Sequence, residues 1–189
     1  MYNKEYKGDV CSHTHSFFLD NFFRRLFQNP KAIVGEYISK GNTVIDLGCG
    51  PGYFSTEMAR LVGLSGKVIA VDLQKEMLEK TKQKAKKLSL EDRIMFHHCP
   101  QDKIGLNGDV KADFILAYYM VHETPDHLKF LTEVKTLLKE KGRFLLVEPP
   151  FHVNKKQFQQ VIRDVETAGF KILGSPTKKG GRALLLSIL

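Results

Sequence analysis

The most constraining feature of this chain is an alternation of short apolar runs with longer helical patterns, which extends from Thr43 to Pro149. The apolar runs are nearly continuous, whereas a strand with one solvent-exposed face would alternate apolar and polar residues. Strands of this kind are covered on both faces, so the pattern predicts a parallel sheet between two layers of helices. The five predicted strands are Thr43–Leu47, Lys67–Leu73, Arg93–His98, Ala112–Tyr119 and Gly142–Pro149.

Helical patterns lie between and after these strands, at Phe54–Val62, Gln74–Leu88, Pro125–Lys139 and Asn154–Ala168. The segment "PQDKIGLNGDVK" between the third and fourth strands is too short and polar to predict a full helix. Near the end of the sequence, "FKILGSP" and "RALLLSIL" predict two strands joined through the turn "TKKGG", and such strands are antiparallel. We therefore expect a doubly wound, Rossmann-like α/β fold with a seven-stranded, mostly parallel sheet and an antiparallel last strand.

The first 40 residues precede this alternation and predict an N-terminal helical cap, residues 1–40, ahead of an α/β domain at 41–189. The stretch "HSFFLDNFFRRLFQ" carries an aromatic stripe, and Asn29-Pro30 interrupts it before a second helix at Lys31–Ile38. Such a stripe is usually core packing. The alternative is that it lies over the mouth of the sheet.

Composition restricts the class of protein. The 189 residues suit one domain with a small appendage, and 42% hydrophobic with 26% charged residues is typical of soluble globular proteins. No apolar run approaches the roughly 20 residues of a membrane span, and "MYNKEYKGDV" has no apolar signal core, so a cytoplasmic protein without a membrane partner is expected. The three cysteines, Cys11, Cys49 and Cys99, have no framework spacing and are interpreted as reduced thiols.

The formal net charge of +8 raises the hypothesis of a nucleic-acid partner. Much of this charge lies in "QKEMLEKTKQKAKKLSLEDR", where lysines alternate with apolar residues. That pattern is typical of the solvated face of an amphipathic helix, which is the favoured interpretation, with nucleic-acid binding as the alternative.

A glycine-rich turn follows the first strand in "VIDLGCGPGYFS", Val44 to Ser55. Open α/β sheets bind ligands at the carboxyl ends of their strands, and alternate glycines at Gly48, Gly50 and Gly52 suggest a close approach to the backbone. The spacing G-x-G-x-G departs from the dinucleotide fingerprint G-x-G-x-x-G. Asp46 ends a buried strand and needs a partner, such as a cationic amino group or backbone N–H groups. A ligand that carries an ammonium and a carboxylate fits both features.

These motifs resemble those of a known family. "VIDLGCGPG" followed by "VIAVDL" resembles the first two motifs of class I S-adenosylmethionine-dependent methyltransferases, and "ADFILAYYMVHETPD…LKEKGRFLLVEP" is similar to their fourth and fifth strand segments. The resemblance covers Thr43 to about Pro149, and the closing strands fit the reversed last strand of that family. It implies a methyltransferase that uses S-adenosyl-L-methionine; an NAD-dependent oxidoreductase is the less favoured alternative.

The resemblance also implies a set of cofactor-binding residues. Gly48, Cys49 and Gly50 would present backbone to the methionine part of the cofactor, and Asp46 would orient that part. Asp72 would accept hydrogen bonds from both ribose hydroxyls. The alternative for Asp72 is a cap on the following helix. The third strand departs from the family pattern because "HHCPQD" lacks the acidic residue that often receives the adenine amino group; Gln101, Asp102 or a backbone carbonyl are the substitutes. The full expected set is Asp46, Gly48, Cys49, Gly50, Gly52, Asp72, Leu73, Met77, Cys99, Pro100, Gln101, Ala117 and Tyr118.

Direct in-line methyl transfer to a small-molecule acceptor is the favoured functional hypothesis. In-line transfer from a sulfonium needs mainly positioning, and the aromatic N-terminal cap could enclose a pocket for a small acceptor. Action on RNA through the basic surface is the alternative. His122 follows the fourth strand and is the expected catalytic residue, as a proton acceptor; alternatively, Glu123 and Thr124 simply cap the next helix, with Pro125 in its first turn.

Three other motifs give weaker indications of function. "EPPF" follows the fifth strand, whereas the adenine-N6 methyltransferase signature follows the fourth, and Cys99-Pro100 reverses the Pro-Cys order of cytosine-C5 enzymes. "CSHTH" places Cys11, His13 and His15 together but lacks a paired second half, so no metal site is expected. A thiol or metalloid acceptor handled by Cys11 and Cys99 remains an alternative to a plain helix cap. The sequence does not predict an oligomeric state.

Overall fold

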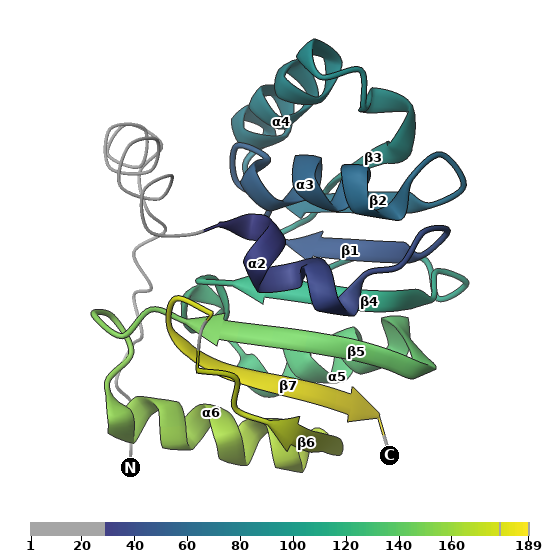
Figure 1. Cartoon of the computed structure of the whole chain (residues 1–189). Helices are drawn as coiled ribbons and strands as arrows, with labels where there is room; N and C mark the ends of the chain where they lie inside the picture. The colour runs from purple at the N-terminus through teal and green to yellow at the C-terminus, as the bar shows by residue number, and fades with distance from the viewer. Residues whose placement is uncertain (1–28, 178, 189) are drawn as a thin grey trace.

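The computed structural model, which describes residues 29–177 and 179–188, contains a seven-stranded sheet in the order β3-β2-β1-β4-β5-β7-β6 (Figure 1). Neighbouring strands from β3 to β5 pair in parallel, while β7 runs antiparallel to both β5 and β6. The predicted α/β fold with one reversed strand is therefore confirmed. The strands are β1 Thr43–Leu47, β2 Lys67–Asp72, β3 Ile94–His98, β4 Ala112–Tyr118, β5 Leu138–Glu148, β6 Phe170–Gly174 and β7 Arg182–Ile188.

Helices cover the two faces of the sheet and bury its apolar runs (Figure 1). One core cluster joins α2, α3 and α4 to residues such as Phe114 and Leu116, and the other joins α5 and α6 to Ile115 and Ala117. Successive residues of β4 thus enter opposite clusters, as the period of a strand requires. The helices are α2 Pro30–Val34, α3 Tyr53–Val62, α4 Lys75–Lys87, α5 His127–Leu137 and α6 Lys155–Thr167, with 3-10 turns at Gly35–Tyr37, Glu91–Arg93 and Val121–Glu123.

Element boundaries around α5 differ from the prediction. The helix begins at His127 rather than Pro125, because the Asp126 side chain accepts a hydrogen bond from the backbone N–H of Lys129 (2.9 Å). The alternative that Glu123 and Thr124 cap this helix is therefore wrong. The helix ends at Leu137 rather than Lys139. Strand β5 starts at once, at Leu138, which is buried and pairs with Ala112 ahead of an irregularity in the β4–β5 ladder.

The amino-terminal part of the described chain forms two short pieces instead of the predicted helix at Lys31–Ile38. Helix α2 begins after Asn29, whose side chain accepts from the N–H of Ala32 (3.4 Å), and a 3-10 turn follows. The expected cap at residues 1–28, with Cys11, His13, His15 and the aromatic stripe, lies outside the described residues. Within residues 29–177 and 179–188, no helix combines the length and the apolar character needed to cross a membrane.

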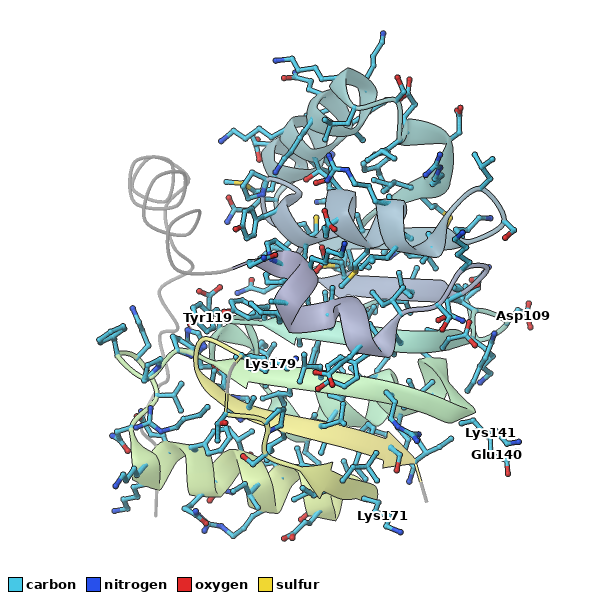
Figure 2. All side chains as sticks on the ribbon, viewed as in Figure 1. Asp109, Tyr119, Glu140, Lys141, Lys171 and Lys179 are labelled. Carbon is cyan, nitrogen blue, oxygen red and sulfur yellow. The ribbon has the colours of Figure 1, made fainter. Side chains whose placement is uncertain are left out.

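Lys179 lies in the loop between β6 and β7 (Figure 2), and its side chain donates hydrogen bonds to the backbone of α2. Its side chain is buried, and Nζ donates to the carbonyls of Ala32 (3.2 Å) and Ile33 (2.8 Å) and to Oε1 of Glu36 (2.5 Å). The ammonium also lies 4.8 Å from the centroid of the Tyr37 ring, within cation–π range.

The same loop is bound to the end of β4. Tyr118 Oη donates to the carbonyl of Lys179 (3.1 Å), and Tyr119 Oη donates to the carbonyl of Gly180. The two tyrosine rings stack with their centroids 4.3 Å apart. The β6–β7 loop therefore supports the residues that end β4, where the site begins.

Candidate active site

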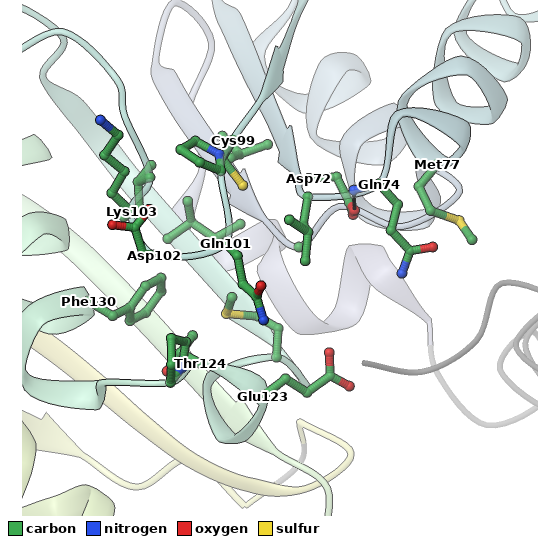
Figure 3. A pocket seen from close by; sticks show the side chains of 18 of the residues that line it. Asp72, Gln74, Met77, Cys99, Gln101, Asp102, Lys103, Glu123, Thr124 and Phe130 are labelled. Carbon is green, nitrogen blue, oxygen red and sulfur yellow. Dashed lines mark hydrogen bonds between the residues drawn. The ribbon is translucent and has the colours of Figure 1, made fainter. Parts of the chain in front are cut away.

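A cavity of about 370 Å³ opens at the carboxyl ends of β1, β2, β3 and β4 (Figure 3). Its size is that of a small-molecule site, and its position is the one expected for an open α/β sheet. The structure brings nine of the predicted site residues together in its walls: Gly48, Gly50, Asp72, Leu73, Met77, Cys99, Pro100, Gln101 and Tyr118.

The other five predicted site residues do not line this cavity. Asp46 and Cys49 are buried behind the glycine turn, and Ala117 faces the core cluster beneath α5 and α6. Gly52 begins α3 and packs against α4, while His122 lies beside the cavity. Their expected roles stay predictions, and for Cys49 and Gly52 the structure gives a packing reason for the residue.

The glycine turn is shaped by its own neighbours. Gly48, Gly50 and Gly52 all have positive φ angles, of 68°, 52° and 76°. A Cβ at Gly48 would lie 3.0 Å from Met120, and one at Gly52 would lie 2.6 Å from Thr81 Cγ2. At Gly50 an added Cβ would meet nothing within 4 Å. At Gly48 and Gly52 the groups that approach the backbone closely are therefore side chains of the protein itself. Of the three glycines, only Gly50, which lines the cavity, has open space where a side chain would be.

Backbone donors of this turn are already used. The N–H of Cys49 donates to the carbonyl of Val71 (3.0 Å), and the N–H of Gly52 donates to the carbonyl of Cys49 (3.1 Å). The N–H of Gly50 donates to Oδ2 of Asp72 (2.8 Å). The N–H groups of Cys49 and Gly50 hold the turn onto β2, and that of Gly52 closes the turn on itself. Their geometry therefore does not support the expectation that they face a ligand carboxylate.

Asp72, at the end of β2, is the fixed carboxylate of the cavity wall. Oδ2 accepts from Gly50 and Oδ1 accepts from the N–H of Gln74 (2.9 Å), and Gln74 rather than Asp72 precedes the first turn of α4. Burial raises the pKa of Asp72, and the hydrogen bonds from Gln74 and Gly50 partly oppose that rise. A carboxylate oxygen can accept more than one hydrogen bond, so both oxygens keep capacity for a ligand.

Asp46 has a different environment from the one the sequence suggests. Its carboxylate is 1% exposed, and Oδ2 accepts from Ser55 Oγ (2.5 Å). Burial raises the pKa of Asp46 to about 7, and the negative charge of Asp72 adds to the rise while the Ser55 hydrogen bond opposes it. The partner that a buried strand-end carboxylate requires is thus supplied by α3.

Because the folded pKa of Asp46 exceeds its unfolded value, the native state binds the extra proton between about pH 4 and pH 7. The free energy of unfolding should therefore fall as pH rises through this window. Asp46→Asn removes the titration, so its stability relative to the wild type should increase by about 2 kcal/mol from about pH 5 to about pH 8. Urea denaturation of both proteins at the two pH values measures this difference, and a constant difference would contradict the prediction.

Sequence reasoning missed Glu148, which ends β5 at the same edge of the sheet. It is fully buried; Oε1 accepts from the backbone N–H of His122 (3.1 Å), and Oε2 lies 2.5 Å from Nδ1 of the same residue. Burial lowers the pKa of His122, but the hydrogen bond and charge of Glu148, with the charge of Glu123, outweigh it and raise that pKa. The sequence did contain a signal for Glu148, because a carboxylate at the end of a buried strand needs a hydrogen-bond partner.

The sequence also did not predict the part of the cavity wall that follows β4. Tyr119 has a φ of 61°, unusual for a non-glycine residue, and it turns the chain from β4 toward the 3-10 turn Val121–Glu123. Other lining residues come from this turn and from the start of α5: Met120, Glu123, Thr124, Pro125, Asp126, Lys129 and Phe130. In the described part of the chain, no cluster of His, Cys, Asp or Glu side chains is arranged to hold a metal ion.

Comparisons with known proteins agree with this geometry. A family model described as "Methyltransferase domain" matches residues 38–179. Demethylmenaquinone methyltransferase of Lactococcus lactis is 31% identical over 136 residues, which cover 66% of this chain and 50% of that protein. Ubiquinone/menaquinone biosynthesis C-methyltransferase of Cronobacter sakazakii is 25% identical over 88% of this chain and 62% of its own length. The chain thus spans about half the length of the curated relatives it matches.

Solved structures give the same result. A SAM-dependent methyltransferase from Aquifex aeolicus has a TM-score of 0.81 and 27% identity, and the match covers 93% of this chain and 98% of that one. A TehB-like SAM-dependent methyltransferase from Corynebacterium glutamicum shares the fold, with a TM-score of 0.71 and 15% identity over 94% and 100% of the two chains. With the family model matched over most of its length, this chain belongs to the class I S-adenosylmethionine-dependent methyltransferases.

Proposed function

We propose that this chain binds S-adenosylmethionine in the cavity at the carboxyl edge and transfers its methyl group to a small-molecule acceptor. The observation that carries the proposal is Asp72, a carboxylate fixed at the cavity wall by the N–H groups of Gly50 and Gln74. Gly50 lies next to Asp72, and the space that a side chain at position 50 would occupy is open. A bound ligand could take that space. When bound, the cofactor supplies a methyl group on a sulfonium, which is already electrophilic.

The residues of the cavity fit that cofactor part by part. Asp72 would accept hydrogen bonds from the two ribose hydroxyls, and Leu73 and Met77 would pack against the nucleoside. The carboxylate of Asp102 already accepts from Lys129 Nζ (3.2 Å), so the side-chain carbonyl of Gln101 is the better candidate in this loop to accept a hydrogen bond from the adenine amino group. These assignments follow from which side chains line the cavity and from the hydrogen bonds that they make.

A small acceptor is favoured over RNA by the charges of the cavity. The lining contains Lys103 and Lys129 against carboxylates at Asp72, Asp102, Glu123 and Asp126, so its mouth is not a basic patch. The lysines of α4 instead lie mostly exposed along that helix, opposite the buried Met77, Leu78, Thr81 and Ala85. The names of the two relatives refer to quinones, demethylmenaquinone in one and ubiquinone and menaquinone in the other. By extension, we propose a hydroxylated aromatic ring as the methyl acceptor of this chain.

Replacing Asp72 by asparagine should weaken S-adenosylmethionine binding by about tenfold, because a charged acceptor of ribose hydroxyls becomes a neutral one. Calorimetric titration with S-adenosylmethionine, its demethylated product and NAD measures this change. Asp113→Asn is the matched control. Asp113 also accepts a backbone N–H, that of Thr43 (2.8 Å), but at the amino end of β4, away from the cavity.

Saturable binding of the first two ligands by the wild type and Asp113→Asn, weakened in Asp72→Asn, would support the proposal. Binding of NAD alone would overturn it in favour of an oxidoreductase. Equal affinity in Asp72→Asn and the wild type would remove Asp72 from the cofactor site.

A further inference from the structure

We propose that Glu123, His122 and Glu148 form a row that accepts the proton of a hydroxylated acceptor, with Glu148 as the positioning residue. The inference rests on the proposed methyl transfer to a hydroxylated aromatic ring, whose nucleophilic electron pair is released when its O–H proton leaves. Its basis is the side-chain arrangement at the carboxyl ends of β4 and β5.

Glu123 is the member of the row that faces the cavity. It lies in the cavity wall, on the far side from Cys99 in the view of Figure 3, at the end of the turn that follows Tyr119. Its Oε1 is 3.9 Å from Nε2 of His122. This distance exceeds a hydrogen bond by about 1 Å, which a small side-chain rotation or one bridging water removes.

Glu148 fixes the imidazole of His122 in a single orientation. Its two oxygens contact Nδ1 and the backbone N–H of His122, and the carboxylate is fully buried. Nδ1–H therefore donates to Glu148, which leaves Nε2 as the acceptor nitrogen on the side of Glu123. A buried carboxylate opposite the proton-accepting nitrogen also stabilises the imidazolium that forms when Nε2 takes a proton.

The charged and titratable groups around His122 come from each neighbouring element. They are Glu148 of β5, Glu123 of its own turn, His152 of the loop after β5 (ring centroids 5.8 Å apart) and Arg182 of β7, which is opposite Glu148 in the antiparallel ladder. Arg182 Nη1 donates to the carbonyl of Val153 (2.8 Å). Glu148 contacts the ring and Glu123 lies 3.9 Å from it, and the charges of both carboxylates favour the protonated imidazole.

The proton balance of the step is simple. The acceptor O–H bond breaks, and its proton passes through the carboxylate of Glu123 to Nε2 of neutral His122. The electron pair left on the acceptor forms the bond to the methyl carbon, and the carbon–sulfur pair leaves with sulfur. The imidazolium then releases its proton to solvent through its exposed side, since the side chain is 22% exposed.

The deciding variant is Glu148→Gln in the full chain, with Asp164→Asn as its matched control. Asp164 also pairs with a histidine, through Oδ2 and His127 Nδ1 (3.3 Å), but on α6 and α5 outside the cavity. The first readout needs no turnover: an NMR titration of the His122 ring, assigned from its loss in His122→Gln. Glu148→Gln should lower the pKa of His122, whereas Asp164→Asn should leave it unchanged.

The second readout is methyl transfer to 1,4-naphthalenediol, a reduced naphthoquinone, as a function of pH. In Glu148→Gln the maximal rate should fall about tenfold and the acidic limb should move to lower pH, because a weaker base is deprotonated earlier. The dissociation constant of S-adenosylmethionine, measured by calorimetry, should stay unchanged. If Glu148→Gln fails to fold, Glu123→Gln takes its place and should lower the rate by a similar factor at unchanged cofactor affinity.

The outcomes separate the two proposals. No binding of S-adenosylmethionine by the wild type would overturn the proposed function itself. Binding without methylation of the diol would overturn the hydroxylated aromatic acceptor, and with it the need for a proton-accepting row. A His122 pKa that is the same in Glu148→Gln and the wild type, or an undiminished transfer rate in the variants, would overturn the proton-accepting row while leaving the methyltransferase proposal intact.

Discussion

Gly52→Ala is expected to lower the free energy of unfolding by about 3 kcal/mol, the sum of a left-handed backbone penalty and an overpacked contact. Gly52 has a φ of 76°, and its new methyl group would lie 2.6 Å from Cγ2 and 2.9 Å from Oγ1 of Thr81. Thr81 cannot move away easily, because it is fully buried on α4 and its hydroxyl donates to the carbonyl of Gly50 (2.7 Å). Chemical denaturation measures the loss.

Gly50→Ala is the matched variant, two residues away in the same turn. Its φ of 52° also disfavours alanine, but the added methyl group meets no atom, so the stability cost should be only about 1 kcal/mol. Its main effect should instead be a weaker binding of S-adenosylmethionine, because the methyl group takes up space beside Asp72. Equal loss of stability in the two variants would show that the contact with Thr81 does not distinguish these glycines.

Lys179→Met is expected to cost about 3 kcal/mol as well, since it leaves the carbonyls of Ala32 and Ile33 without their donor in a buried site. It also removes the cation from the face of the Tyr37 ring. Lys171→Met, at an exposed position of β6, is the control and should change stability by less than about 0.5 kcal/mol.

Hydrogen exchange gives a local test of the same contact. The amides of α2 should lose protection in Lys179→Met and keep it in Lys171→Met. Lys179→Arg, which retains a buried cation, should recover part of the stability. A Lys179→Met protein with wild-type stability and α2 protection would mean that these hydrogen bonds hold nothing in place.

The backbone of the fold could be predicted because its signals are local. Continuous apolar runs identify the strands of a sheet covered on both faces, and the hairpin-like ending identifies the reversed strand. The predicted boundary between α5 and β5 was wrong because Leu138 joins the strand by pairing with Ala112, and this contact links residues that are distant in the sequence. Local propensity carries no record of that pairing.

The candidate site was predictable where one motif builds it and not where several segments meet. Gly50, Asp72 and Cys99 stand at or just after strand ends, were expected there from the family resemblance, and all line the cavity. Glu148 was missed because its importance depends on His122, which belongs to a different strand end. The contact that requires a glycine at position 52 could not be predicted for a similar reason, because the atoms that a Cβ there would meet belong to Thr81 in the next helix.

The position of β7 has a consequence for biosynthesis. This strand follows all the others in sequence, yet it lies between β5 and β6, and the loop before it holds both the tyrosines at the end of β4 and the helix α2. A chain emerging from the ribosome would display β5 with an unpaired edge until residues 182–188 arrive. The nascent protein therefore cannot complete the wall around Tyr118 and Tyr119 early, and competence to capture a ligand should appear only after residues 182–188 have been synthesised.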